Sequence, residues 1–172
     1  MDDCPCRDRY PSWMVLVTMM HALSVYAFGL ALTFLAHPWL SVIYVAMVAL
    51  MECRLLRKSC TDCYYHGRRC AFGRGRLSGR LFPPGDGSAF RRTDLSWKVM
   101  APDVLMTMFP VLSGAWALIS TFSWWALLAL ASFILLITAG NSLIRGNLAC
   151  RHCVQREMGC PAERLFNARD EN

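Results

Sequence analysis

The sequence predicts an all-α integral membrane protein, with four transmembrane helices in two hairpins and a small cytoplasmic cysteine-rich head. Three observations support this prediction. Hydrophobic residues make up 55% of the 172 residues and charged residues only 17%, whereas about a quarter of a soluble domain is charged. Asp, Glu, Lys and Arg are absent from positions 10–51 and 104–144. All nine cysteines lie outside these two runs.

The first hairpin is expected within the first uncharged run, which is 42 residues long. One helix of that length would measure about 63 Å, but a helix needs only about 20 residues to cross a bilayer. The run must therefore turn, and Ala36-His37-Pro38 marks the place because proline disfavours helix at the residue before it. We expect spans near residues 13–35 and 39–55.

The second hairpin is expected around the 41-residue uncharged run that follows Asp103. Its polar break is Ser120-Thr121-Phe122-Ser123, which predicts spans near residues 99–119 and 124–143. The chain then divides into an N-terminal tail (1–12), hairpin 1 (13–55), a central Cys/Gly/Arg-rich loop (56–98), hairpin 2 (99–143) and a Cys-rich C-terminal tail (144–172).

The basic residues predict the orientation in a multi-pass cell membrane protein. Of the 18 Lys and Arg residues, two lie in the N-terminal tail, eleven between positions 54 and 98, and five between 145 and 169. The two hairpin turns have none. Because Lys and Arg accumulate in cytoplasmic loops, we expect both termini and the central loop on the cytoplasmic side.

The cysteines form an internal repeat. Cys60, Cys63 and Cys70 have the spacing C-x2-C-x6-C, and the same spacing recurs 90 residues later. The second triplet is Cys150, Cys153 and Cys160, and the cysteines outside the repeat are Cys4, Cys6 and Cys53. Each triplet follows a predicted hairpin, which predicts two halves related by an axis along the membrane normal.

Two C-x2-C pairs with a third cysteine at the same offset indicate metal binding. The cytosol keeps thiols reduced, and thiolates bind zinc, copper(I) and iron–sulfur clusters. Zinc would take Cys60, Cys63, Cys150 and Cys153 as one site. Iron–sulfur clusters would use each triplet, with a fourth ligand from Cys4, Cys6 or Cys53 or an open position. The number of cysteines slightly favours iron–sulfur, and buried or reactive free thiols are the alternative.

The central loop carries candidate anion-binding residues. Its glycines and Pro83-Pro84 are typical of a loop rather than a helix over residues 71–98. The candidates for holding an anionic cofactor or partner are Arg68, Arg69, Arg74 and Arg76. The alternative is attraction to anionic lipid headgroups. Nucleic acid is not expected, since no recognised binding module is present.

Two polar residues in the predicted spans are candidate catalytic or proton-carrying groups. Asp103 lies within the predicted span 99–119, and an intramembrane carboxylate is a functional candidate. The alternative is an interfacial or capping role. His21 lies about one-third of the way into the first span. It is a candidate for proton transfer or metal binding, and a contact between helices is the alternative.

These observations favour a membrane-anchored metal–thiolate protein for redox or electron-transfer chemistry, with iron–sulfur as the favoured cofactor. Its partner would be a redox protein, or a quinone or lipid substrate. Whether the chain forms a homo-oligomer is left open by the sequence. The first alternative is a zinc-stapled scaffold or assembly factor without catalysis. The second is a thiol-dependent metal transporter or sensor. Motifs of ordinary hydrolases and NTPases are absent from the sequence, and whether the protein is an enzyme stays open.

Overall fold

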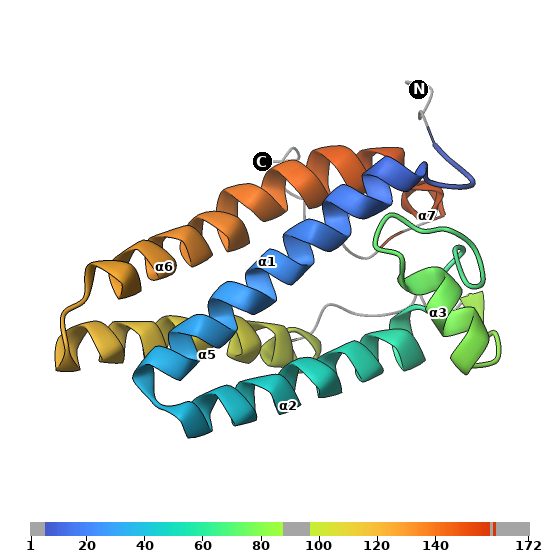
Figure 1. The fold of residues 1–172 in the computed structure, drawn as a ribbon. Helices are drawn as coiled ribbons and strands as arrows, with labels where there is room; N and C mark the ends of the chain where they lie inside the picture. Colours follow the sequence, from blue (N-terminus) through green and yellow to red (C-terminus); the bar gives the residue numbers. More distant parts are fainter. Residues whose placement is uncertain (1–5, 88–96, 159, 161–172) are drawn as a thin grey trace.

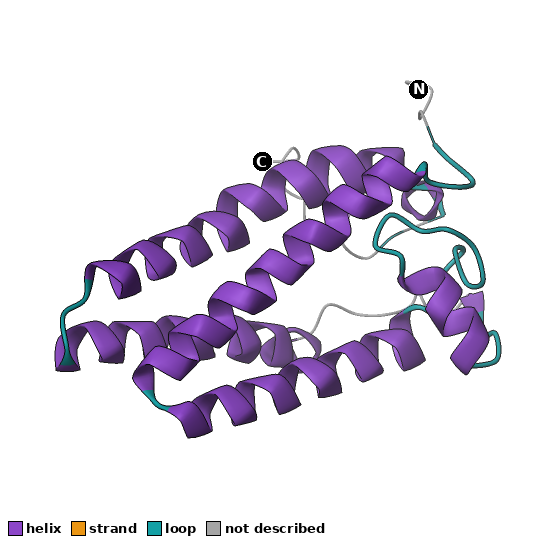
Figure 2. Ribbon diagram, viewed as in Figure 1, coloured by secondary structure: helices purple, strands orange, loops and turns teal. Residues whose placement is uncertain are grey.

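Four long helices dominate the computed structural model, which describes residues 6–87, 97–158 and 160. The described residues form helices and loops without a strand (Figure 2). The four helices are long and apolar enough to cross a membrane, and they span Ser12–Ala36, Pro38–Ser59, Trp97–Ser120 and Trp124–His152. This arrangement confirms the prediction of an all-α chain with four spans (Figure 1).

The second helix of each hairpin ends in a π-helical segment, a wider turn than the α-helix. In the first hairpin, α1 (Ser12–Ala36) is followed by α2 (Pro38–Arg54), which continues as η1 (Leu55–Ser59). In the second hairpin, α5 (Trp97–Ser120) is followed by α6 (Trp124–Leu135), which continues as η2 (Leu136–Ala149). The short elements outside the hairpins are α3 (Arg74–Leu81), η3 (Cys150–His152) and α7 (Val154–Glu157).

Both hairpins turn where the sequence predicted. His37 has extended backbone angles (φ −168°, ψ 136°) between α1 and α2, and Pro38 occupies the first turn of α2. The second turn separates Ser120 from Trp124. The last span continues to His152 rather than ending near residue 143, because η2 and η3 extend the helix beyond the uncharged run.

Helix α1 is the central helix of the bundle, since it contacts α2, α5, α6 and η2. Its buried side follows helical spacing and is rich in small or polar residues: Met14, Thr18, His21, Gly29, Leu32 and Thr33. The Thr18 hydroxyl donates to the carbonyl oxygen of Met14 at 3.1 Å, and that of Thr33 to Gly29 at 3.0 Å. Small residues let membrane helices approach closely, as Gly29 does where Tyr44 of α2 packs against it.

Large apolar side chains remain exposed along all four spans. Among the most exposed are Trp13, Leu16, Trp39, Leu50, Leu112, Ile119, Trp125 and Leu135. So large an exposed apolar surface would be a liability in water. It is the surface expected of helices that face hydrocarbon chains.

The glycine-rich part of the central loop contains a helix, so the prediction of a loop throughout residues 71–98 is wrong over α3. Two of its glycines, Gly75 and Gly79, serve close approach. A Cβ atom on Gly75 would meet the carbonyl oxygens of Tyr65 and Arg68, and one on Gly79 would lie 2.6 Å from the Cα atom of Gly67. Helix α3 can therefore pack directly on the backbone of the preceding loop. Residues 88–96 lie outside the described residues.

Candidate functional site

Three segments that are far apart in the sequence meet at the end of the bundle opposite the hairpin turns (Figure 1). They are the N-terminal segment, the central loop and the segment after η2. Their buried core consists of Tyr10, Met14, Tyr65, Ala71 and Ala149, which we call the end cluster. This cluster joins the first hairpin to the second outside the bundle itself.

Two tyrosines hold the end cluster together through hydroxyl groups bonded to the backbone. Tyr10 donates to the carbonyl oxygen of Ala149 at 2.6 Å. Tyr65 donates to the carbonyl oxygen of Arg7 at 2.6 Å and accepts from the amide of Val154 at 3.1 Å. The two rings lie 5.5 Å apart between centroids. Buried polar groups need hydrogen-bond partners. Each of these hydroxyl groups has such partners in the backbone of another segment.

A buried glutamine adds a second connection between the central loop and the C-terminal segment. The Tyr64 amide donates to the side-chain oxygen of Gln155 at 2.9 Å, and Gln155 is buried. Sequence analysis missed Gln155, Tyr10 and Tyr65. The available signal was the Tyr64-Tyr65 pair directly after Cys63, where two aromatic residues interrupt a polar loop.

Both cysteine triplets contribute to this region. Cys63, Cys70 and Cys153 pack against the end cluster. Burial raises the pKa of Cys63 to about 12, and the neighbouring Cys153 thiol adds to the rise. Burial likewise raises the pKa of Cys60 to about 11, and the Cys70 thiol adds to the rise. These thiols are therefore protonated at neutral pH and are weak nucleophiles.

The other cysteines have varied surroundings. Cys150 is exposed, Cys160 is half-buried, and Cys53 is exposed on the last turn of α2. Cys6 is disulfide-bonded, so its sulfur is not a thiolate in this state, and it lies 3.7 Å from the carbonyl oxygen of Cys153. Cys4 lies outside the described residues. Among the residues described, no three His, Cys, Asp or Glu side chains are grouped so that they could hold a metal ion.

No known protein family, curated protein or solved structure matches the chain.

Three of the four candidate arginines have partners within the described part of the chain. Arg74 forms an ion pair with Glu52 of α2, in which its Nε atom donates to Oε2 at 2.7 Å. Glu52 also accepts from the Tyr26 hydroxyl. The Arg68 guanidinium lies over the Tyr64 ring, 4.7 Å from its centroid. Arg69 donates to the Ser12 hydroxyl at 3.0 Å.

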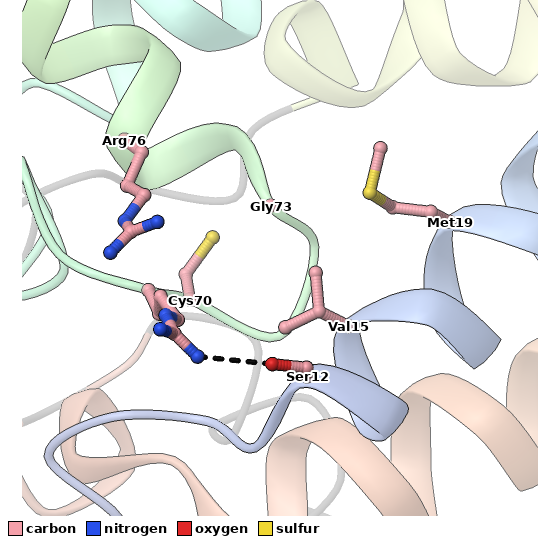
Figure 3. A pocket seen from close by; sticks show the side chains of 7 residues that line it. Ser12, Val15, Met19, Cys70, Gly73 and Arg76 are labelled. Atoms are coloured by element: carbon pink, nitrogen blue, oxygen red, sulfur yellow. Dashed lines mark hydrogen bonds between the residues drawn. The ribbon is translucent and has the colours of Figure 1, made fainter.

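Arg69 and Arg76 line a cavity of about 370 Å³ between the start of α1 and the start of α3. The other lining residues are Ser12, Val15, Met19, Cys70 and Gly73. Figure 3 shows Arg76 on one side and Val15 and Met19 on the other, with Cys70 and Gly73 between them. The cavity therefore has a cationic wall and an apolar wall.

The two candidate proton carriers have contrasting surroundings. His21 is buried, and its Nε2 atom lies 3.3 Å from Oδ1 of Asn141 in η2. Its Nδ1 atom is buried without a hydrogen-bond partner in the described part of the chain. Asp103 lies on an exposed position near the start of α5. The contact with η2 gives His21 a role in packing, whereas a proton-transfer role for either residue stays a prediction.

Proposed function

We propose that this chain is a membrane-anchored metal–thiolate protein whose cysteine triplets hold a redox centre, iron–sulfur by preference, at the cytoplasmic surface of the cell membrane. The observation that carries the proposal is the meeting of the two triplets at one end of the bundle. Cys63 and Cys153 belong to different triplets, yet both pack against the end cluster. This contact brings thiols of both triplets to one region, as a shared centre requires.

The proposal includes an orientation with both termini and the central loop in the cytoplasm. Its support is the distribution of Lys and Arg, which are absent from both hairpin turns. The segments that carry them lead into the end cluster, opposite the turns (Figure 1). All of the basic segments would then face one side of the membrane.

The proposal also treats the chain as two related halves, each a hairpin followed by a cysteine triplet. Its support is a shared order of elements. In each half the second helix continues as a π-helical segment, and the first cysteine of the triplet follows directly, as Cys60 after η1 and Cys150 after η2.

A shared centre requires the thiols to move closer than they lie in the described structure, where no three potential ligands are grouped for a metal. The segments that carry the two triplets would close on each other when the metal binds. Metal binding also requires loss of the thiol protons. Iron–sulfur is preferred because six repeated cysteines exceed the four ligands of one zinc ion.

The test is the metal and sulfide content of protein purified without oxygen, together with its absorbance spectrum. We expect iron with matching acid-labile sulfide, and loss of both in Cys63→Ser and Cys153→Ser. Thr61→Ala is the matched control, because Thr61 lies between Cys60 and Cys63 but carries no thiol. Protein without metal, or variants that keep all of it, would contradict the proposal.

A zinc-stapled scaffold is a second candidate, and the end cluster favours it. Tyr10 and Tyr65 already connect the central loop and both terminal segments. A zinc ion on Cys60, Cys63, Cys150 and Cys153 would strengthen the same connection. Zinc without sulfide, and a lower unfolding temperature after chelation, would identify this function instead.

A further inference from the structure

The cavity between α1 and α3 combines two features that an anionic lipid would need. Arg69 and Arg76 supply positive charge, and none of the seven lining residues is acidic. Val15 and Met19 supply an apolar wall. The volume of about 370 Å³ exceeds that of several water molecules and admits a phosphate group with the first part of an attached chain.

The other candidate arginines are used elsewhere, which distinguishes this pair. Arg74 is paired with Glu52, and Arg68 lies over the ring of Tyr64. Arg69 is oriented by its hydrogen bond to Ser12, the first residue of α1. Within the described part of the chain, the Arg76 guanidinium has no hydrogen-bond or ion-pair partner. One oriented and one available guanidinium therefore border the same space.

The cavity also lies at the end of a candidate membrane span, where we expect lipid phosphates. Ser12 begins a membrane-spanning helix, and the exposed Trp13 beside it is typical of the membrane–water interface. Val15 and Met19 follow one and two turns into the span. The cationic wall comes from the loop and α3, outside the span. The cavity is therefore polar toward the aqueous side and apolar toward the span, as a bilayer is.

We propose that this cavity binds the phosphate group of an anionic phospholipid, with Arg69 and Arg76 on the phosphate and the start of an acyl chain against Val15 and Met19. The binding does not depend on a metal centre. A soluble phosphate compound offers the same charge to the arginines, but it would make no use of the apolar wall.

The experiment compares lipid retention after the protein is extracted from nanodiscs that contain equal amounts of phosphatidylglycerol and phosphatidylcholine. Native mass spectrometry counts the lipids that remain bound. We expect wild-type protein to keep phosphatidylglycerol selectively, and Arg69→Gln/Arg76→Gln to lose it by about 25-fold, since each arginine contributes about fivefold. Arg80→Gln is the matched control, because Arg80 lies on the same helix but does not line the cavity.

A second variant tests the apolar wall and covers the case in which the double variant fails to fold. Met19→Trp fills that wall and keeps both arginines, so it should also lose phosphatidylglycerol. Equal loss in Arg80→Gln, or equal retention of phosphatidylcholine, would overturn the proposal. A third outcome would assign the cavity to a soluble phosphate compound and overturn its assignment to a lipid. In that outcome inorganic phosphate displaces the lipid, and Met19→Trp retains as much phosphatidylglycerol as the wild-type protein.

Discussion

His21 occupies a tightly limited space between α1 and η2. A Cβ atom on Gly140 would lie 2.6 Å from its Cε1 atom and 3.2 Å from its Nδ1 atom. The imidazole therefore packs directly against the backbone of η2, as expected in a close-packed interior. The position of His21 therefore depends on the absence of a side chain at residue 140.

Substitution of Gly140 tests this contact. Gly140→Leu should lower the free energy of unfolding by about 1–3 kcal/mol through overpacking, measured by denaturation in detergent. Gly140→Leu combined with His21→Ala should recover part of the loss, because the ring is then absent. A double variant as unstable as Gly140→Leu alone would show that the two residues do not compete for the same space.

Substitution of Tyr65 tests the end cluster, because its hydroxyl group bonds the backbone of both Arg7 and Val154. Tyr65→Phe should lower stability by about 1–3 kcal/mol by leaving buried backbone groups without partners. Hydrogen exchange at the Val154 amide should become faster. Tyr64→Phe is the control, because its hydroxyl bonds Asp8 at an exposed position, and a surface change is worth about 0.5 kcal/mol or less. Unchanged exchange in Tyr65→Phe would contradict this role.

At the scale of elements, the ion pair between Arg74 and Glu52 attaches α3 to α2. Both side chains are mostly covered, with 17% and 27% of their surfaces exposed. An unpaired charge in such a place is costly, and breaking a fully buried pair costs about 3–5 kcal/mol. The attachment of α3 should therefore depend on Arg74 far more than on the other arginines of the same helix.

Arg74→Gln should loosen α3 and lower stability by about 1–3 kcal/mol, less than for a fully buried pair. Limited proteolysis within residues 74–81 and thermal unfolding would measure the two effects. Arg80→Gln should change neither. Glu52→Gln/Arg74→Gln should recover part of the loss, and a double variant worse than Arg74→Gln would show that Glu52 is not the partner that matters.

The elements differed in how far the sequence could predict them. The spans were predictable because hydropathy and the position of Pro38 act locally along the chain. The helix α3 was not, because the fit of Gly75 against Tyr65 and Arg68 exists only after folding. The same is true of the end cluster, in which Tyr65 and Val154 are 89 residues apart. Cysteine spacing identified candidate ligands, but not which of them lie together.

At the scale of the whole molecule, we expect the even number of candidate spans to place the two ends of the bundle's chain on the same side of a membrane. Four helices that each cross a bilayer would cross it twice in each direction. The basic residues predict that this side is the cytoplasm. The end cluster, which contains Tyr10 and contacts Val154, is consistent with ends that share a compartment.

Reporter fusions test this topology. A fluorescent protein that matures only in the cytoplasm should give signal at either terminus and none when inserted after His37. A reporter that is active only outside the cytoplasm should show the reverse pattern. Signal from the cytoplasmic reporter after His37 would contradict the predicted orientation.

The central position of α1 has a consequence for the order of synthesis. Its buried polar residues, such as His21, are covered by η2 and the other late elements of the chain. The ribosome completes α1 long before it reaches residue 140. During that interval the imidazole faces lipid or the insertion machinery, where a polar group is costly. A chain truncated after the first hairpin should therefore be a substrate for membrane quality control, whereas the complete chain should escape it.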